Sequence, residues 1–278
     1  MRSKLFVPCS RPDFFAKALA GEADALSFDL EDAVPAGDKA AARTRLVEWL
    51  RSDAVGSSAK QVIVRINAPD TPYFADDLAA LAGLRVDIVN LPKAESADKV
   101  RTVGARMDRI GIAADLLVNI ESASGMARAA TIARAHPRVT GLQVGLNDLF
   151  ASLGIDRRDA RHVHAALWAI RLAAGETARL AYDGAWPDLA DDDGFRAEAE
   201  LARSLGYLGK SCIHPRQVAI ANAVFDRGDD LARAKRLLAA AAEAETLGRG
   251  AFVFEGAMAD APAIAAARET VRRAGGAR

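Results

Sequence analysis

The chain has 278 residues, of which 51% are hydrophobic, and its 37 basic and 37 acidic side chains leave a formal net charge of zero. This balance argues against a nucleic-acid or membrane-surface binder, since either would normally carry a basic excess. The two cysteines, Cys9 and Cys212, form neither a disulfide framework nor a metal-ligand spacing. No signal peptide or membrane-length apolar run is found, so we expect a cytoplasmic protein with no membrane or nucleic-acid partner.

Eight short apolar runs alternate with helix-like segments along residues 1–227. We expect the first run to lead into a helix with Ser10 as its N-cap and Asp13 at the capping-box position. The predicted strands are residues 4–8, 25–30, 61–67, 86–92, 116–122, 141–149, 180–183 and 209–215.

Strands that alternate with helices predict parallel pairing through right-handed crossovers. Eight such units at this length favour a closed (β/α)8 TIM barrel with its active site at the carboxyl ends of the strands. The alternative is an open doubly wound sheet, but the chain lacks the G-x-G-x-x-G turn that usually accompanies nucleotide binding there.

The remaining residues, 228–278, form a predicted C-terminal helical extension. It starts with an Ala-rich helix over about 229–247, continues through a turn at Gly248 and Gly250, and ends with a helix to about Arg273. No ninth strand is needed to close a barrel, so we expect this extension to pack on the barrel or on a neighbouring subunit.

Two consecutive apolar runs end in acids, Glu121 and Asp148, with a helix-like segment between them. Consecutive strand–helix units bring both carboxylates to the same edge of the sheet. Oxygen ligands at that edge suit a hard divalent cation such as Mg²⁺. The alternative is that both acids simply cap the helices that follow.

A second group of charged residues lies at neighbouring strand ends. Arg65 falls inside an apolar strand, where a buried guanidinium is costly unless paired. It must therefore meet a structural acid such as Asp29 or Glu31, or an anionic substrate group held bidentately, and both can hold at once. Lys93 suggests either a Schiff-base aldolase or an electrostatic partner for the nearby acids. His214 suggests either catalysis or a role at the start of the next helix.

The chain resembles the citrate lyase beta-subunit-like family, within the 2-keto acid aldolases and malyl-thioester lyases. The motifs that carry this resemblance follow in one order over nearly the whole chain: Lys4-Leu-Phe-Val-Pro8, Arg11-Pro12, Phe28-Asp-Leu-Glu-Asp-Ala-Val34, Val64-Arg-Ile-Asn67, Leu91-Pro-Lys-Ala-Glu95, Asn119-Ile-Glu-Ser122, Gly145-Leu-Asn-Asp-Leu149 and Lys210-Ser-Cys-Ile-His-Pro215.

The resemblance implies a (β/α)8 barrel with Mg²⁺ at Glu121 and Asp148, and with Arg65 on the substrate's oxygens. It also implies a homotrimer or a multiple of it, whose C-terminal segment reaches a neighbour's active site. An aspartate in that segment acts as acid/base in the family's CoA-thioester lyases, which makes Asp260 the candidate; a plain N-cap is the alternative. The family usually has Gly at the position of Cys9, and it often has Glu at the position of Asn147.

The predicted function is a Mg²⁺-dependent carbon–carbon lyase. It would cleave or form a 3-hydroxy-3-carboxy acyl thioester, such as citryl-, malyl- or citramalyl-CoA, giving a 2-oxo acid and an acyl thioester. Residues expected around the substrate, orienting waters and Arg65, are Asp29, Glu31, Asp32, Lys93 and His214. The alternatives are a class II aldolase acting on free 2-keto acids and a metal-binding subunit active only in a larger lyase complex.

Overall fold

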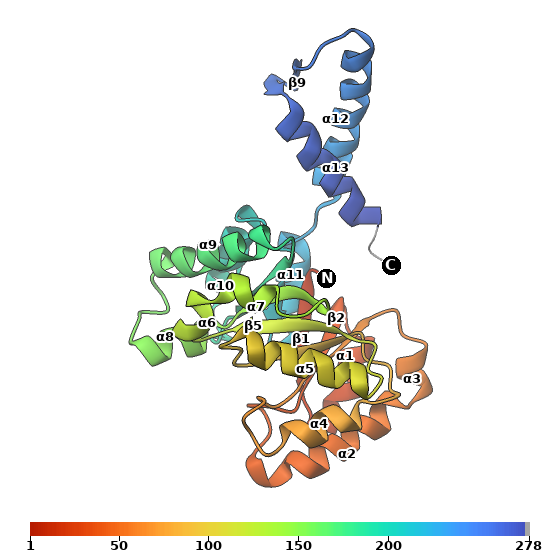
Figure 1. Ribbon diagram of the computed structural model, residues 1–278, viewed down its shortest axis with the longest axis vertical. Coiled ribbons are helices and arrows are strands. Elements are labelled where there is room, and N and C mark those ends of the chain that lie inside the picture. The colour runs from red at the N-terminus through yellow and green to blue at the C-terminus, as the bar shows by residue number, and fades with distance from the viewer. Residues whose placement is uncertain (276–278) are drawn as a thin grey trace. The chain divides into compact units, whose positions relative to one another are not determined.

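Eight parallel strands close into a barrel in sequence order, which confirms the predicted (β/α)8 fold (Figure 1). β1 pairs with β2 on one side and with β8 on the other, and these two ladders complete the ring. The strands of this computed structural model are β1 (Ser3–Pro8), β2 (Ala25–Asp29), β3 (Gln61–Arg65), β4 (Ile88–Leu91), β5 (Asp115–Ile120), β6 (Val139–Val144), β7 (Leu180–Ala185) and β8 (Lys210–Cys212).

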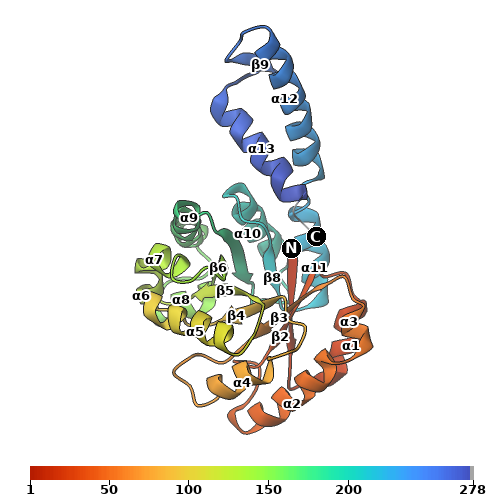
Figure 2. The same cartoon turned by 45° about the vertical axis from the view of Figure 1, so that its right-hand side comes forward.

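Helices surround the strands on the outside of the barrel (Figure 2). The strand side chains that face them are apolar, as Leu26 and Phe28 of β2 show, and the Phe28 ring meets Phe15 edge-on at 5.1 Å. The helices are α1 (Phe15–Ala20), α2 (Lys39–Leu50), α3 (Asp53–Gly56), α4 (Phe74–Ala80), α5 (Ala97–Arg109), α6 (Ala123–Ala127), α7 (Ala129–Ala133), α8 (Leu146–Leu153), α9 (Ala160–Glu176), α10 (Asp192–Ser204) and α11 (Pro215–Val224), with the 3-10 turns η1 (Pro12–Phe14) and η2 (Ala36–Asp38).

The barrel interior changes from apolar to charged along the strands. Alternate residues of a strand share a face, so β2 turns Ala25, Ser27 and Asp29 inward in succession. The first inward layer is an apolar cluster of Ala25, Ile63, Ile88 and Leu117. The next layer is buried but polar, with Lys4, Ser27, Asn90, Asn119 and Gln143. The charged groups then gather at the carboxyl ends of the strands, where barrel enzymes bind their substrates.

Two local predictions were wrong. Ser10 is not an N-cap, because its hydroxyl donates to the carbonyl of Ala33 instead of accepting from a helix amide. The run predicted over 141–149 is not one strand, because β6 ends at Val144 and α8 begins at Leu146. Asp148 therefore lies in the first turn of a helix, and Gly145 forms the break between the two elements.

The structure describes residues 1–275, which divide into two compact units, one of Met1–Phe225 and one that begins at Asp226. The second unit contains α12 (Gly228–Thr246), an antiparallel hairpin of β9 (Phe252–Phe254) and β10 (Ala257–Ala259), and α13 (Ala261–Gly275). The extension is thus helical as predicted, but it also contains a hairpin that the prediction lacked. Its packing on a neighbouring subunit stays a prediction.

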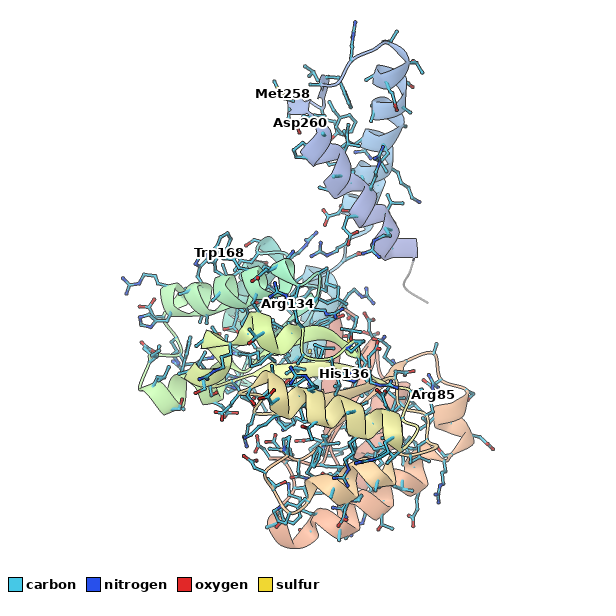
Figure 3. All side chains as sticks on the ribbon, in the orientation of Figure 1. Arg85, Arg134, His136, Trp168, Met258 and Asp260 are labelled. Atoms are coloured by element: carbon cyan, nitrogen blue, oxygen red, sulfur yellow. The ribbon has the colours of Figure 1, made fainter. Side chains whose placement is uncertain are left out.

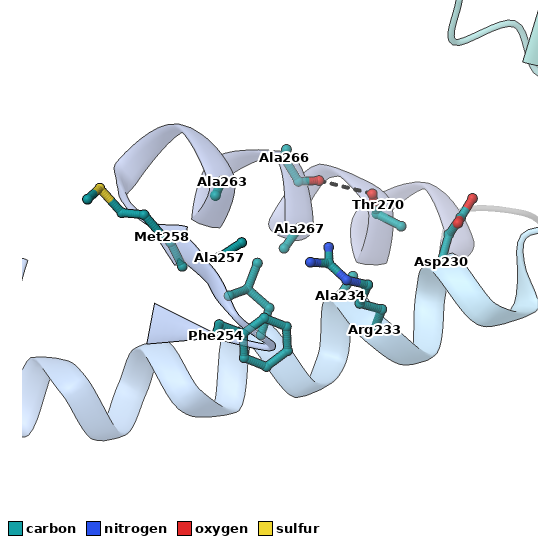
Figure 4. A pocket seen from close by; sticks show the side chains of 12 residues that line it. Asp230, Arg233, Ala234, Phe254, Ala257, Met258, Ala263, Ala266, Ala267 and Thr270 are labelled. Atoms are coloured by element: carbon teal, nitrogen blue, oxygen red, sulfur yellow. Dashed lines mark hydrogen bonds between the residues drawn. The ribbon is translucent and has the colours of Figure 1, made fainter. Parts of the chain in front are cut away.

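The second unit has a small core of its own, formed by Ala234, Leu237, Ala259 and Ala267. Beside it, a cavity of about 260 Å³ is lined largely by alanines, with Arg233, Phe254 and Met258 around it (Figure 4). Within residues 1–275, no helix is both long and apolar enough to cross a lipid bilayer.

Candidate active site

Arg65, the last residue of β3, is held by a buried acid. Its Nε and Nη2 donate to the two carboxylate oxygens of Asp29 at 2.8 and 2.6 Å. Asp29 also accepts the backbone amides of Glu31 and Ala33. Burial alone would raise the pKa of Asp29, but Arg65 and these hydrogen bonds outweigh it and hold that pKa below its usual value. Asp29 is therefore the structural partner of Arg65, one of the two options the sequence left open.

The other edge of Arg65 faces the acids of the β2–α2 loop. Its Nη1 lies 2.9 Å from Glu31 and 3.5 Å from Asp32. Lys93, after β4, reaches the same two acids, with its Nζ 2.7 Å from Glu31 and 3.4 Å from Asp32. This pairing supports the reading of Lys93 as an electrostatic partner of the acids. It holds an ammonium against a carboxylate, whereas a Schiff base requires a free amine.

Lys93 also has a left-handed backbone, with φ of 52°. That conformation is costly for a residue with a Cβ, and such strain is common at functional sites. In this backbone conformation the Lys93 amide donates to Glu121 Oε1 at 2.7 Å, while the Lys93 side chain reaches Glu31. One residue therefore links the predicted metal acid to the Arg65 cluster.

Glu121 follows β5 and is buried, whereas Asp148 is exposed in the first turn of α8. Gly145 leaves the space that Glu121 occupies, since a Cβ at position 145 would lie 2.4 Å from Glu121 Cβ and 2.6 Å from its Oε2. Burial raises the pKa of Glu121 to about 7, and the nearby charges of Glu31 and Asp148 add to this effect.

These residues fit a divalent cation. Five carboxylates (Asp29, Glu31, Asp32, Glu121 and Asp148) lie among four basic side chains (Lys4, Lys39, Arg65 and Lys93), so the acids outnumber the bases. No group of three or more His, Cys, Asp or Glu side chains within residues 1–275 is arranged to enclose a metal. Two carboxylates with room for waters and substrate oxygens is the arrangement that Mg²⁺ usually takes in proteins.

The structure also places the two remaining predicted residues. His214 is exposed and caps α11, its Nδ1 accepting the amide of Arg216 at 3.2 Å, which is the helix-start role. Asp260 precedes α13 in the second unit (Figure 3), and its Oδ1 accepts the amide of Ala263 at 3.3 Å. Asp260 therefore forms an N-cap, and its catalytic role stays a prediction.

Several polar residues that support the site were not predicted. Lys39 donates to the carbonyls of Leu30 and Glu31 at 2.7 and 2.6 Å, and Asn67 donates to Leu30, so the acid-bearing loop is fixed from two sides. Lys4 lies buried in the barrel and donates to Gln143. The sequence signal for Lys4 was its position in an apolar strand. The contacts of Lys39 depend on the path of a loop, which no local sequence pattern predicts.

A pocket of about 550 Å³ opens between β1, α1 and the start of α11. Its walls are mostly apolar and include Phe6, Phe14 and Ile213, with Lys17 and His214 among the polar lining. The Phe6 ring lies 4.8 Å from the Arg65 guanidinium, so the pocket adjoins the charged cluster. Its volume is typical of a site for a small organic ligand.

The comparisons with known proteins agree with the predicted family and fold. The family model described as HpcH/HpaI aldolase/citrate lyase matches residues 2–215. The (3S)-malyl-CoA thioesterase of Cereibacter sphaeroides is 38% identical over 275 residues, covering 98% of this chain and 94% of the relative. The L-malyl-CoA/beta-methylmalyl-CoA lyase of the same organism is 37% identical over 301 residues, with the same coverage.

The chain is also similar to solved structures in sequence and in fold. Protein CitE from Mycobacterium tuberculosis, in complex with magnesium, acetoacetate and coenzyme A, is 38% identical, with a TM-score of 0.76 over 99% of this chain and 100% of that chain. The citrate lyase beta subunit from M. tuberculosis, complexed with oxaloacetate and magnesium, is 36% identical, with a TM-score of 0.68 over 81% of this chain and 96% of that chain. The chain belongs to the HpcH/HpaI aldolase/citrate lyase family.

Proposed function

We propose that this chain is a Mg²⁺-dependent carbon–carbon lyase that acts on a 3-hydroxy-3-carboxy acyl thioester, in either direction. The observation that carries the proposal is the pair Glu121 and Asp148 beside an arginine fixed by a buried acid. The relatives agree in chemistry, since they include an L-malyl-CoA/beta-methylmalyl-CoA lyase and proteins solved with magnesium, coenzyme A and oxo acids.

Glu121 and Asp148 would hold the cation through carboxylate oxygens. Bound there, Mg²⁺ would supply Lewis-acid polarisation of the substrate's hydroxyl and carboxylate oxygens. Arg65 would donate to the oxygens on which negative charge develops, and Asp29 keeps its guanidinium in one orientation for that task. Glu31, Asp32 and Lys93 would set the position of Arg65 and of the Glu121 carboxylate.

Bond cleavage converts the substrate's hydroxyl into the carbonyl of the 2-oxo acid, which releases the hydroxyl proton to water, and it leaves the electron pair on the α-carbon of the thioester. A proton must then be delivered to that carbon. Asp260 is our candidate for this acid, and it would remove the same proton in the condensation direction. We place it in a neighbouring subunit of a homotrimer or a multiple of it. The pocket lined by Phe6, Phe14 and His214 would take the thioester arm, with Lys17 available to an anionic group.

A second candidate is hydrolysis of the same thioester. It is favoured by one observation: the malyl-CoA thioesterase aligns with this chain over 275 positions, whereas the lyase needs 301 for the same coverage. The alignment with the thioesterase therefore contains fewer gaps than the alignment with the lyase.

One screen separates these activities. Purified protein is incubated with malyl-CoA, citramalyl-CoA or citryl-CoA and Mg²⁺, with and without EDTA, while 2-oxo acid and free CoA thiol are assayed separately. A lyase releases the 2-oxo acid and leaves the CoA acylated, whereas a thioesterase releases free thiol and no 2-oxo acid. Absence of both from all three substrates would contradict the proposal and favour a free keto-acid aldolase or a subunit that needs partners.

A further inference from the structure

A chain of four charged side chains, three of them buried and Arg157 partly exposed, runs through the barrel wall on the side of β7 and β8. Lys210 of β8 lies 2.6 Å from both Asp183 of β7 and Glu198 of α10. The side chains of Lys210 and Asp183 have no exposed surface. Glu198 then meets Arg157 in the loop between α8 and α9 through two contacts of 2.5 and 2.8 Å. The charges alternate in sign, so each buried ion has an opposite partner.

Arg157 connects this chain to the residue next to Asp148. After its two terminal nitrogens have bonded Glu198, its Nε donates to Asn147 Oδ1 at 3.0 Å. The other end of the Asn147 amide donates to the carbonyl of Ala185, the last residue of β7, at 3.4 Å. Both ends of this amide are therefore held, and Asn147 forms the first turn of α8 together with Asp148.

We infer that Arg157 is a positioning residue for the metal carboxylate of Asp148, and that it acts through Asn147; this inference rests on the proposed function. Asp148 is exposed on a short helix, and the Asn147 side chain next to it is the one that Arg157 holds. The planar, rigid guanidinium of Arg157 bonds the buried Glu198 and Asn147 at the same time, and this fixes the orientation of the first turn of α8 relative to the barrel wall. Side chains that orient metal ligands in this way typically contribute 10–100-fold to metal affinity.

The fork geometry separates positioning from a purely structural ion pair. A lysine at position 157 can neutralise Glu198, but it cannot also present a second, fixed N–H to Asn147. R157K therefore keeps most of the thermal stability while it loses the restraint on the turn. The adjacent Arg158 is the matched control, because it is an exposed arginine whose partner is Asp188.

The test is calorimetric titration of the full-length protein with Mg²⁺ alone, together with the melting temperature of each variant. We expect R157K and N147A to weaken Mg²⁺ binding about tenfold or more. We expect the double variant to be no weaker than either single one, because both changes break the same link. R158K should bind Mg²⁺ like the wild type.

The two proposals fail in different ways. If D148A binds Mg²⁺ as tightly as the wild type, the metal site of the proposed function is wrong and this inference falls with it. If D148A loses Mg²⁺ while R157K and N147A stay within twofold of the wild type, only the inference on Arg157 is overturned. N147A removes no charge and tests the link even if a variant at position 157 does not fold.

Discussion

Replacing Asp29 with asparagine should destabilise the protein strongly, although the change is nearly isosteric. The Asp29 side chain is only 2% exposed and carries four contacts, two from Arg65 and two from backbone amides. All four contacts come from donors, whereas asparagine offers one acceptor and one donor group. In the variant, the amide NH2 of the asparagine would face N–H groups that now donate to Asp29, and the Arg65 charge would lose its main partner.

Loss of one partner from a buried ion pair costs about 3–5 kcal/mol. At about 2–4 °C per kcal/mol for a domain of this size, D29N should melt roughly 6–20 °C below the wild type. The control is D13N, which breaks an arginine–aspartate pair with the same two-bond geometry, but on the surface. Calorimetry should find D13N within about 4 °C of the wild type. A drop for D29N no larger than that for D13N would refute the reasoning.

The same prediction has a definite pH dependence. Because the pKa of Asp29 in the folded protein is held below its usual value, the contribution of this group to stability is present at neutral pH and is lost in acid. The unfolded-state pKa is about 4, so the gap in unfolding free energy between wild type and D29N should be largest above pH 5. It should shrink as the pH falls below about 4. A gap that widens in acid would contradict the assignment of an ionised Asp29.

Four further outcomes follow from the site. Mg²⁺ at a hundred times its Kd should stabilise the protein by about 2.7 kcal/mol, and EDTA or Asp148→Ala should abolish that shift in a thermal melt. Because the pKa of Glu121 in the metal-free protein is raised to about 7, Mg²⁺ affinity should fall about tenfold per pH unit below 7, whereas a flat calorimetric profile would contradict a protonated Glu121. Lys93→Gly should be more stable than Lys93→Ala in urea by about 1 kcal/mol, since both lose the pair with Glu31 but only glycine accepts the positive φ freely. Asp260→Asn should abolish most lyase activity on a thioester, and retention of full turnover would favour an aldolase on free 2-keto acids.

The fold was predictable because its signal is repeated. Eight apolar runs separated by helical segments leave few topologies, and the wall-facing strand positions are indeed apolar. What failed was local: the predicted run over 141–149 crosses Gly145, where the chain changes from strand to helix without a polar interruption. The hairpin of β9 and β10 was missed for a similar reason. Its strands have three residues each, too few to show alternation.

The charged residues of the site were predictable as a set, but their pairings were not. Strand ends meet at one edge of a barrel, and this rule was enough to gather Asp29, Arg65, Lys93 and Glu121. The rule did not predict whether Arg65 pairs with a protein acid or stays available to bind a substrate, because that depends on distances of a few ångströms. The contact between Arg157 and Glu198 joins positions 41 residues apart, and no local sequence pattern records it.

The distribution of charge favours the binding of a divalent cation at this end of the barrel. A fully neutralised cluster would be more stable without a ligand, because buried ions are costly unless each has its partner. The row of charged side chains from Asp183 to Arg157 is neutralised in this way, because positive and negative charges alternate along it. The cluster around Glu121 is not, since its acids outnumber its cations. Burial raises the pKa of Glu121, and the nearby charges of Glu31 and Asp148 raise it further. The charges from Asp183 to Arg157 are thus balanced and stabilise the barrel wall. The cluster around Glu121 has an excess of negative charge, which a divalent cation would neutralise.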